Sequence, residues 1–191
     1  MKKKIGSQNV LYPMPVTIVG ALVNKKPNFL NVAHVGILNA GVPHLISLGM
    51  GKVHYTNIGI REHKTFSVNI LSQDQMKEMD YVGLVSGSKI DKSGVFETFF
   101  GELETAPLIR NCPLSMECRL YDTYELKSHD IFIGEIVATY ADEAVLTENK
   151  VDLAKVKPLL FDMSSMQYWS LGTAVGDCWS EGKQYKAADK G

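Results

Sequence analysis

Hydroxyl groups beside glycines and helix starts are the first residues of this sequence that could do chemistry. Ser47 is followed by Leu48 and Gly49, so a hydroxyl stands next to a backbone that can approach a ligand closely. Thr56 follows Tyr55 just before an expected helix start, where backbone N–H groups and the helix dipole favour negative charge. These residue types therefore indicate an anion site, although each taken alone is also ordinary turn or capping chemistry.

A second group of donors lies further along the chain. The turn Ser86-Gly-Ser88 and Lys92 could supply hydrogen bonds and positive charge to a phosphate. The alternative is that Lys92 is a solvated lysine paired with Asp91, which has nothing to do with a ligand.

Several apparent motifs do not meet the spacing that their chemistry requires. Gly49-Met-Gly51 lacks the third glycine of a dinucleotide fingerprint, and Gly83 to Lys89 has the wrong spacing for a P-loop. Cys112 and Cys118 are separated by five residues, outside zinc-finger spacing. His34, His44 and His54 recur every ten residues without ligands at helical offsets, and no nucleophile elbow is present. The sequence therefore favours neither a metal site nor a hydrolase, and no side chain is assigned as catalytic.

The elements that must position these residues read mainly as strands. Short apolar segments rich in β-branched residues predict strands over Val16–Val23, Phe29–Leu38, His44–Leu48, Cys118–Leu126 and Ile131–Tyr140. The last of these is apolar on both faces, which predicts burial on both sides, as in a closed barrel with something packed outside it.

Helices are fewer. Ser72-Gln-Asp-Gln75 is a capping box, and Met76, Met79 and Val82 follow at helical spacing. A shorter helix is expected over Asn57–His63, capped by Thr56 or Asn57, and another over Val151–Val156. Strands and helices do not alternate, so a Rossmann-type sheet is not expected.

Composition bounds the class of protein. The 191 residues suit one domain, taken as 1–191 with a core over about 10–182 and flexible tails, and the 45% apolar fraction suits a globular core. The formal charge of −1 argues against nucleic-acid binding, and no apolar run is long enough for a membrane helix. Lys2 to Lys4 are not followed by an apolar export signal, and three cysteines are few for a secreted scaffold, so we expect a cytoplasmic protein.

The order of small motifs along the chain resembles that of the flavin reductase-like, FMN-binding split-barrel family, and within it the flavoredoxin branch. The resemblance spans about residues 10 to 182 and rests on an ordered series: Tyr12-Pro-Met-Pro15, Lys26-Pro-Asn28-Phe, Asn31-Val-Ala33, Pro43-x-x-x-Ser47, Tyr55-Thr56, Phe66-Ser-Val-Asn69, Ser86-Gly87 ahead of Asp91-Lys92, Met116-Glu-Cys118, His129, Phe132-Ile-Gly-Glu-Ile136 and Tyr168-x-x-Leu-Gly172-x-x-x-Gly176.

This resemblance implies a fold and a set of cofactor contacts. The fold would be a six-stranded Greek-key split barrel with a few flanking helices, forming a homodimer with one FMN per subunit. The implied contacts with the flavin, ribityl chain and phosphate are Asn28, Asn31, Val32, Ala33, His34, Ser47, Leu48, Gly49, Thr56, Lys92, His129 and Phe161. For Asn28, His129 and Phe161 the alternatives are a turn residue, a solvated strand end and a core residue, respectively.

The resemblance also implies an activity. FMN would carry electrons from NAD(P)H or a redox protein to an acceptor, as in an NAD(P)H:flavin reductase-like oxidoreductase. Two alternatives stay open: a non-enzymatic FMN electron carrier, and a flavin-free β-barrel that binds another ligand.

Overall fold

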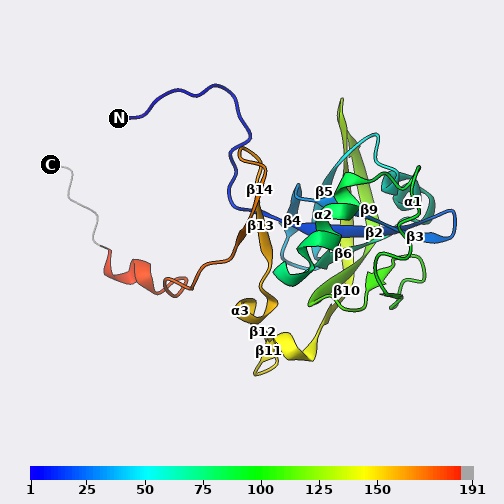
Figure 1. Ribbon diagram of the computed structural model, residues 1–191. Helices are drawn as coiled ribbons and strands as arrows, with labels where there is room; N and C mark the ends of the chain where they lie inside the picture. Colours follow the sequence, from blue (N-terminus) through cyan, green and yellow to red (C-terminus); the bar gives the residue numbers. More distant parts are fainter. Residues whose placement is uncertain (186–191) are drawn as a thin grey trace.

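Seven antiparallel strands form the main sheet of the computed structural model, which describes residues 1–185 (Figure 1). Across the sheet the order is β3-β2-β6-β9-β10-β5-β4. The bounds are β2 Thr17–Val23, β3 Lys26–Val32, β4 Val35–Asn39, β5 Leu45–Gly51, β6 Thr65–Ile70, β9 Leu114–Glu125 and β10 His129–Ala141.

The predicted strand Phe29–Leu38 is wrong in one respect, because it is two strands at opposite edges of the sheet. Only Ala33 and His34 lie between the end of β3 and the start of β4. Since the chain passes from one edge to the other through these two residues, the sheet closes into a barrel. With β3 and β4 counted as one bent strand, the barrel has the six strands that were predicted, and the mainly β fold is confirmed.

A small second sheet lies beside the barrel. It is formed by β1 Met14–Pro15, β13 Leu159–Asp162 and β14 Gln167–Ser170, in the order β1-β13-β14. Two further strand pairs join β7 Thr98–Phe99 to β8 Leu108–Ile109, and β11 Leu146–Thr147 to β12 Lys150–Val151.

The helices are α1 Thr56–His63, α2 Met76–Leu84 and α3 Leu153–Val156. The capping box is observed ahead of α2: the Ser72 hydroxyl accepts from the Asp74 N–H, and the Gln75 side chain accepts from the Ser72 N–H. The predicted cap of α1 is wrong, because the N-cap is Tyr55 and its side chain makes no capping bond. No helix in residues 1–185 is long and apolar enough to cross a membrane.

Two apolar cores follow from the alternation of side chains along β2. Val19 and Ala21 belong to the barrel interior, whereas Ile18 belongs to a second core that includes Met79 and Val82 of α2. The barrel core also contains Leu48 and Phe132, both fully buried. Met79 and Val82 are therefore buried as the periodicity predicted, whereas Met76, the first of the three predicted positions, is exposed.

Strand β10 is buried on one face only within this chain. Phe132 is fully buried, but Ile131 and Ile133 on the other face are only partly covered. The predicted burial on both sides is therefore not met within a single chain.

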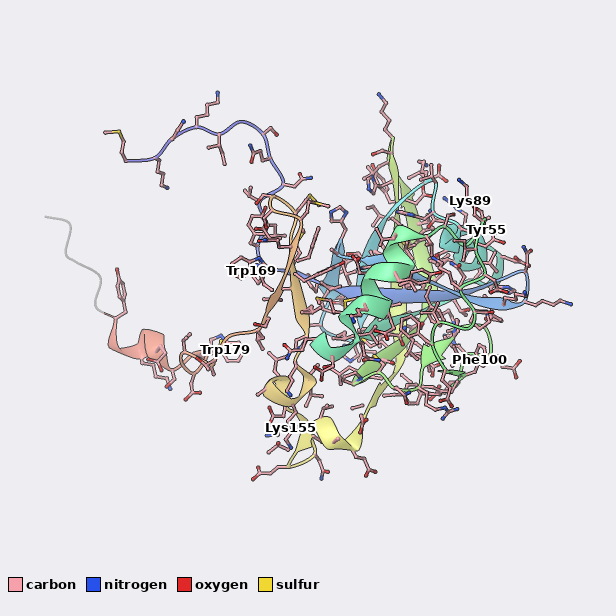
Figure 2. The ribbon with its side chains drawn as sticks, in the orientation of Figure 1. Tyr55, Lys89, Phe100, Lys155, Trp169 and Trp179 are labelled. Carbon is pink, nitrogen blue, oxygen red and sulfur yellow. The ribbon has the colours of Figure 1, made fainter. Side chains whose placement is uncertain are left out.

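Both ends of the chain leave the body on the same side, next to the β1-β13-β14 sheet (Figure 1). Trp169 and Trp179 lie on this side, whereas Tyr55, Lys89 and Phe100 lie on the other (Figure 2). A 3₁₀ turn covers Glu181–Gln184 and overlaps the start of the tail after Gly182, which was expected to be flexible. The rest of that tail, residues 186–191, lies outside the described residues.

Candidate functional site

Two adjoining cavities lie where the barrel closes. The larger has a volume of about 410 Å³, and the smaller, of about 180 Å³, shares His54, Gly83 and Leu84 with it. The larger is bounded by the β3–β4 link, the end of β5, the start of β10 and the β13–β14 hairpin, and α2 contributes to both. Together they make an elongated site with two chemically different ends.

Most of the predicted contacts lie in these cavities. The larger one is lined by seven of them: Asn31, Val32, Ala33, His34, Gly49, His129 and Phe161. Thr56 and Lys92 line the smaller one. Asn28 lies just beyond, in a third cavity of about 350 Å³ that is also lined by Lys92.

Ser47 and Leu48 do not line these cavities. The Ser47 hydroxyl donates to the Gly36 carbonyl of the neighbouring strand at 3.2 Å, and the Leu48 side chain is fully buried in the barrel core. The structure therefore brings Gly49 to the site but not the side chains of the two residues before it, and their contact with a cofactor stays a prediction.

Three histidines line the larger cavity. The rings of His34 and His129 lie 6.0 Å apart between centroids, and the His129 Nδ1 is 2.9 Å from the Ser128 hydroxyl. Burial, followed by the charges of His129 and Lys92, lowers the pKa of His54 below its usual value. Residues 1–185 contain no cluster of three His, Cys, Asp or Glu side chains that could hold a metal ion. The three imidazoles give the cavity a polar wall.

The phenol of Tyr168 also lines this cavity. Tyr168 of β14 donates to the Asp80 carboxylate of α2 at 2.8 Å and accepts from the Asn31 amide of β3 at 3.1 Å. Burial, then the hydrogen bond to Asp80, raises the pKa of Tyr168 to about 12. The phenol therefore keeps its proton at neutral pH and ties the β13–β14 hairpin to the barrel.

Lys92 is turned inward rather than solvated. It is 3% exposed, and its ammonium donates to the carbonyls of Val82 and Val85 at 3.0 and 3.1 Å. The alternative of a surface pair with Asp91 is wrong, because Asp91 pairs with Lys26 at 2.6 Å. An ammonium carries three N–H donors, so one remains for a ligand in the smaller cavity.

Thr56 is held at the first turn of α1 with its hydroxyl proton unused. Its hydroxyl oxygen accepts from the Asn28 amide at 2.7 Å, and among residues 1–185 no acceptor takes its proton. Gly87 lets the loop after α2 approach this pair, because a Cβ there would clash with the Asn28 amide oxygen and the Tyr55 ring. The smaller cavity thus offers a hydroxyl, an ammonium and a helix start to an anion.

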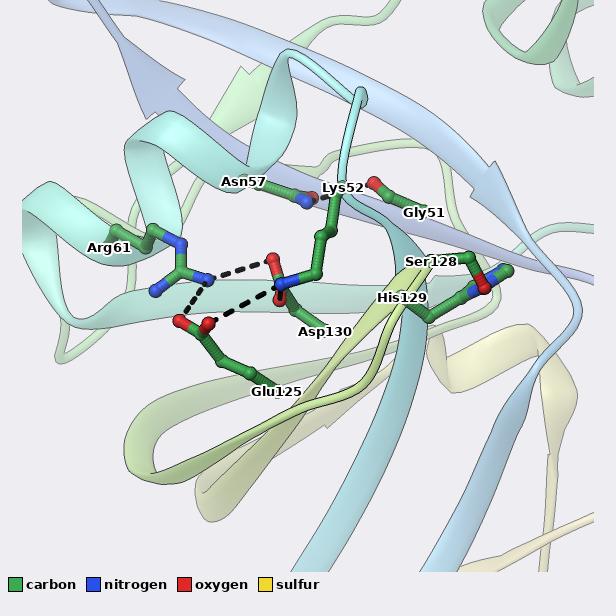
Figure 3. A network of polar contacts seen from close by, with 8 residues as sticks. All are labelled: Gly51, Lys52, Asn57, Arg61, Glu125, Ser128, His129 and Asp130. Atoms are coloured by element: carbon green, nitrogen blue, oxygen red, sulfur yellow. Dashed lines mark hydrogen bonds and ion pairs between the residues drawn. The ribbon is translucent and has the colours of Figure 1, made fainter.

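A charged network fixes the start of β10 beside the site (Figure 3). The Asp130 carboxylate, 4% exposed, contacts Lys52 and Arg61 at 2.8 Å each. Glu125, at the end of β9, contacts the same two cations at 3.4 Å. Because Asp130 follows His129 directly, this network also sets the position of the His129 backbone.

Sequence reasoning missed several lining residues. Tyr168 was part of the motif series but not of the expected contacts, and His54 was considered only as a metal ligand. Nothing in the sequence around Asp80 marks it as a site residue, because its role is to accept a hydrogen bond from Tyr168, which lies 88 residues further along the chain. Met163 and Met166, in the β13–β14 turn, also line the larger cavity.

Comparison with solved structures shows where this architecture is found. The chain is similar to the flavoredoxin from Methanosarcina acetivorans, with 44% identity, a TM-score of 0.93 and coverage of 96% of this chain and 98% of that chain. It is also similar to the flavoredoxin of Desulfovibrio vulgaris (Miyazaki F), with 32% identity, a TM-score of 0.88 and coverage of 95% and 100%. An FMN-binding protein from Thermus thermophilus shares the fold at 22% identity and a TM-score of 0.79, with coverage of 93% and 99%.

A family model for the flavin reductase-like domain matches residues 9–170. These residues include both sheets, all three helices and every predicted contact of the site. The chain therefore belongs to the flavin reductase-like domain family.

Proposed function

We propose that this protein binds FMN in the two adjoining cavities and passes electrons through it, from NAD(P)H or a protein donor to an acceptor. The observation that carries the proposal is the polarity of the site: imidazole and apolar walls at one end, a hydroxyl and an ammonium at the other. FMN has the same two ends, a flat ring system and a phosphate. The similarity to flavoredoxins supports the same assignment.

The residues present fit this cofactor. The larger cavity, of about 410 Å³, lies within the usual range for small-molecule sites. Val32 and Phe161 give it apolar walls for a ring, and the Lys92 ammonium keeps one N–H donor for the phosphate. Gly83 borders both cavities, and a Cβ there would lie 3.1 Å from the Cβ of Asn31, which lines the larger cavity.

When bound, FMN supplies the redox chemistry itself, so the protein needs no nucleophile or general base. The side chains hold and orient the cofactor: Thr56 and Lys92 at the phosphate, His34 and His129 at the ring. The Tyr168–Asp80 hydrogen bond holds the hairpin that carries Phe161 against the cavity.

The test is the visible spectrum of the purified protein. We expect a yellow protein with the two absorption bands of flavin, and a cofactor released by acid that behaves as FMN. If the protein is colourless and takes up neither FMN nor riboflavin, the flavin-free β-barrel is the correct reading.

A plain electron carrier is the second candidate, favoured by the similarity to flavoredoxins. Stopped-flow mixing of the FMN-loaded protein with NADH and with NADPH separates the two. Prompt bleaching of the flavin absorbance supports a reductase, and no bleaching with either nucleotide supports a carrier fed by a protein donor.

Replacing Thr56 with alanine is expected to weaken FMN binding by about 1–2 kcal/mol, because the ligand loses a donor and the Asn28 amide loses its acceptor. Fluorescence titration of the apoprotein measures the change. Thr56→Ser keeps the hydroxyl and serves as the control, expected to bind within about 0.5 kcal/mol of the wild type on the same scale. Unchanged affinity in Thr56→Ala would make Thr56 a structural residue only.

We also propose that the protein is a cytoplasmic homodimer. Support comes from the partly covered outer face of β10 and from exposed Ile37 and Leu38 on the edge strand β4. The three cysteines are unpaired, with Cys112 and Cys118 buried, which suits a reducing compartment.

A further inference from the structure

The C-terminal segment 171–185 has apolar side chains with nothing to cover them. Val175 is 100% exposed and Trp179 is 90% exposed. Every hydrogen bond that the structure gives residues 171–185 joins two residues of this segment, so none ties it to the barrel. The segment lies beyond residue 170, where the match to the family model ends.

Its composition is not that of a solvated tail. Between Tyr168 and Ser180 the only charged residue is Asp177, and both tryptophans of the chain lie in this stretch. Flexible tails are usually poor in aromatics and rich in charge. Large apolar side chains concentrated in an exposed segment usually mark an interaction surface.

A matching groove lies at the base of the same segment. It has a volume of about 360 Å³ and is lined mostly by Tyr12, Pro13, Leu160, Phe161 and Trp169. The lining is therefore largely apolar and aromatic, as the exposed side chains of the segment require. Phe161 lines both this groove and the larger cavity of the site.

We infer that residues 171–185 of one subunit dock in this groove on a second copy of the chain. Each subunit would then pack against the outer side of Phe161, a wall residue of the other subunit's proposed flavin site. The segment leaves the body away from the barrel (Figure 1), and the groove at its base is lined by residues of the same chain outside the segment. Because segment and groove lie on the same chain, one two-fold axis places both segments in both grooves at once.

The reach of the segment is sufficient. The nine residues from Leu171 to Trp179 can span about 30 Å when extended, which is comparable to the width of a domain of this size. Docking would place a partner side chain against the back of Phe161. The inference rests on the proposed homodimer, and it adds that the site wall is completed by the partner.

Photocrosslinking of the full-length protein tests this docking. The photoreactive residue p-benzoylphenylalanine replaces Trp179 in chains mixed from normal and heavy-isotope cultures. Illumination is expected to give a product of twice the 21.2 kDa chain mass, with crosslinked peptides that contain residues 12–13 or 159–170 of the other isotope form. Phe100, also exposed but on the opposite side of the molecule, is the control position and is expected to give no crosslink to this groove (Figure 2).

Two other outcomes would overturn the docking. Crosslinks within one chain would show that the segment folds back on its own barrel, and crosslinks to neither chain would show that it is free in solution. Acrylamide quenching of the Trp169→Phe variant, in which Trp179 is the only tryptophan, is an independent check. Quenching of the native variant is expected to be several-fold weaker than that of the same variant in urea, and equal quenching in both overturns the inference.

The test separates this inference from the proposed FMN function. Crosslinking and quenching are read on the protein whether or not it is yellow, so a colourless protein with crosslinked partners would reject only the cofactor. A yellow protein with a free segment would reject only the docking.

Discussion

FMN is expected to bind about tenfold or more weakly to a Lys92→Met variant, while riboflavin binding stays nearly unchanged. Methionine keeps most of the aliphatic stem but removes the ammonium, and a charge-assisted hydrogen bond to phosphate contributes about 1.5–3 kcal/mol. Riboflavin has the same ring and ribityl chain without the phosphate, so it reports any general damage to the site. Fluorescence titrations with both ligands give the comparison.

The control is Lys26→Met, which removes a neighbouring lysine that is exposed and paired with Asp91. We expect it to change FMN affinity by less than about 1 kcal/mol. Methionine at position 92 also leaves the Val82 and Val85 carbonyls without their donor, so thermal unfolding of the variant should accompany the titrations. Equal losses for FMN and riboflavin would show that Lys92 supports the helix and does not bind the phosphate.

The same lysine gives FMN binding a pH dependence. Burial lowers the pKa of Lys92 to about 8 in the free protein. A bound phosphate favours the charged ammonium, so this pKa rises in the complex. FMN affinity is therefore expected to fall as pH rises above about 8, because binding then requires uptake of a proton. The Lys92→Met variant should lack this fall, and riboflavin should not show it with either protein.

The second large effect is expected at Asp130. The Asp130→Ala variant should have a free energy of unfolding about 2–3 kcal/mol lower than that of the wild type. The Asp130 carboxylate is almost fully buried and makes the shorter contacts with Lys52 and Arg61, so the variant leaves two neighbouring cations with only the exposed Glu125 carboxylate. Denaturant unfolding at neutral pH measures the loss. Glu125→Gln is the matched control in the same network, since Glu125 is 62% exposed and should change stability by less than about 1 kcal/mol.

The contribution of Asp130 to the free energy of unfolding also depends on pH. The hydrogen bond from Lys52, together with that from Arg61, holds the pKa of Asp130 below its ordinary value of 3.8. A carboxyl group with a lowered folded pKa stabilises the protein above its unfolded pKa, and this stability is lost as pH falls through the folded pKa. The difference between wild type and Asp130→Ala should therefore be full at pH 6 and shrink below about pH 4. A difference that is independent of pH would assign the effect to packing instead.

The sequence predicts those elements of the fold whose start or type is determined by neighbouring residues in the chain. A capping box precedes helix α2, and β9 and β10 are long segments rich in β-branched residues. The bounds of all three elements were therefore predicted within a few residues. The break between β3 and β4 was not predicted, because it falls at Ala33 and His34, where no glycine, proline, asparagine or aspartate marks a turn. The break results from closure of the barrel, which is a property of the whole sheet.

The site shows the same limit. Gly49 was predicted as a site residue from the motif around it, and it lines the larger cavity. Ser47 belongs to the same motif, but its hydroxyl donates to the Gly36 carbonyl of the neighbouring strand. Lys92 was predicted as a phosphate ligand, with a surface lysine as the alternative. It is buried against the end of α2, which excludes the surface alternative and leaves the phosphate contact a prediction. Which way a lysine turns depends on carbonyl acceptors that the fold brings to it, and no pattern in the sequence records their position.

The uncovered edge of the barrel has a consequence for how the protein must be handled. Strand β4 pairs on one side only, with β5, and its other side exposes backbone donors and acceptors next to Ile37 and Leu38. No lysine or proline within β4 protects this edge, which is the usual safeguard against edge-to-edge association. A newly made chain that has not found its partner is therefore exposed to aggregation. Yield should improve when synthesis is slowed, because each chain then has more time to assemble before its edges meet at random.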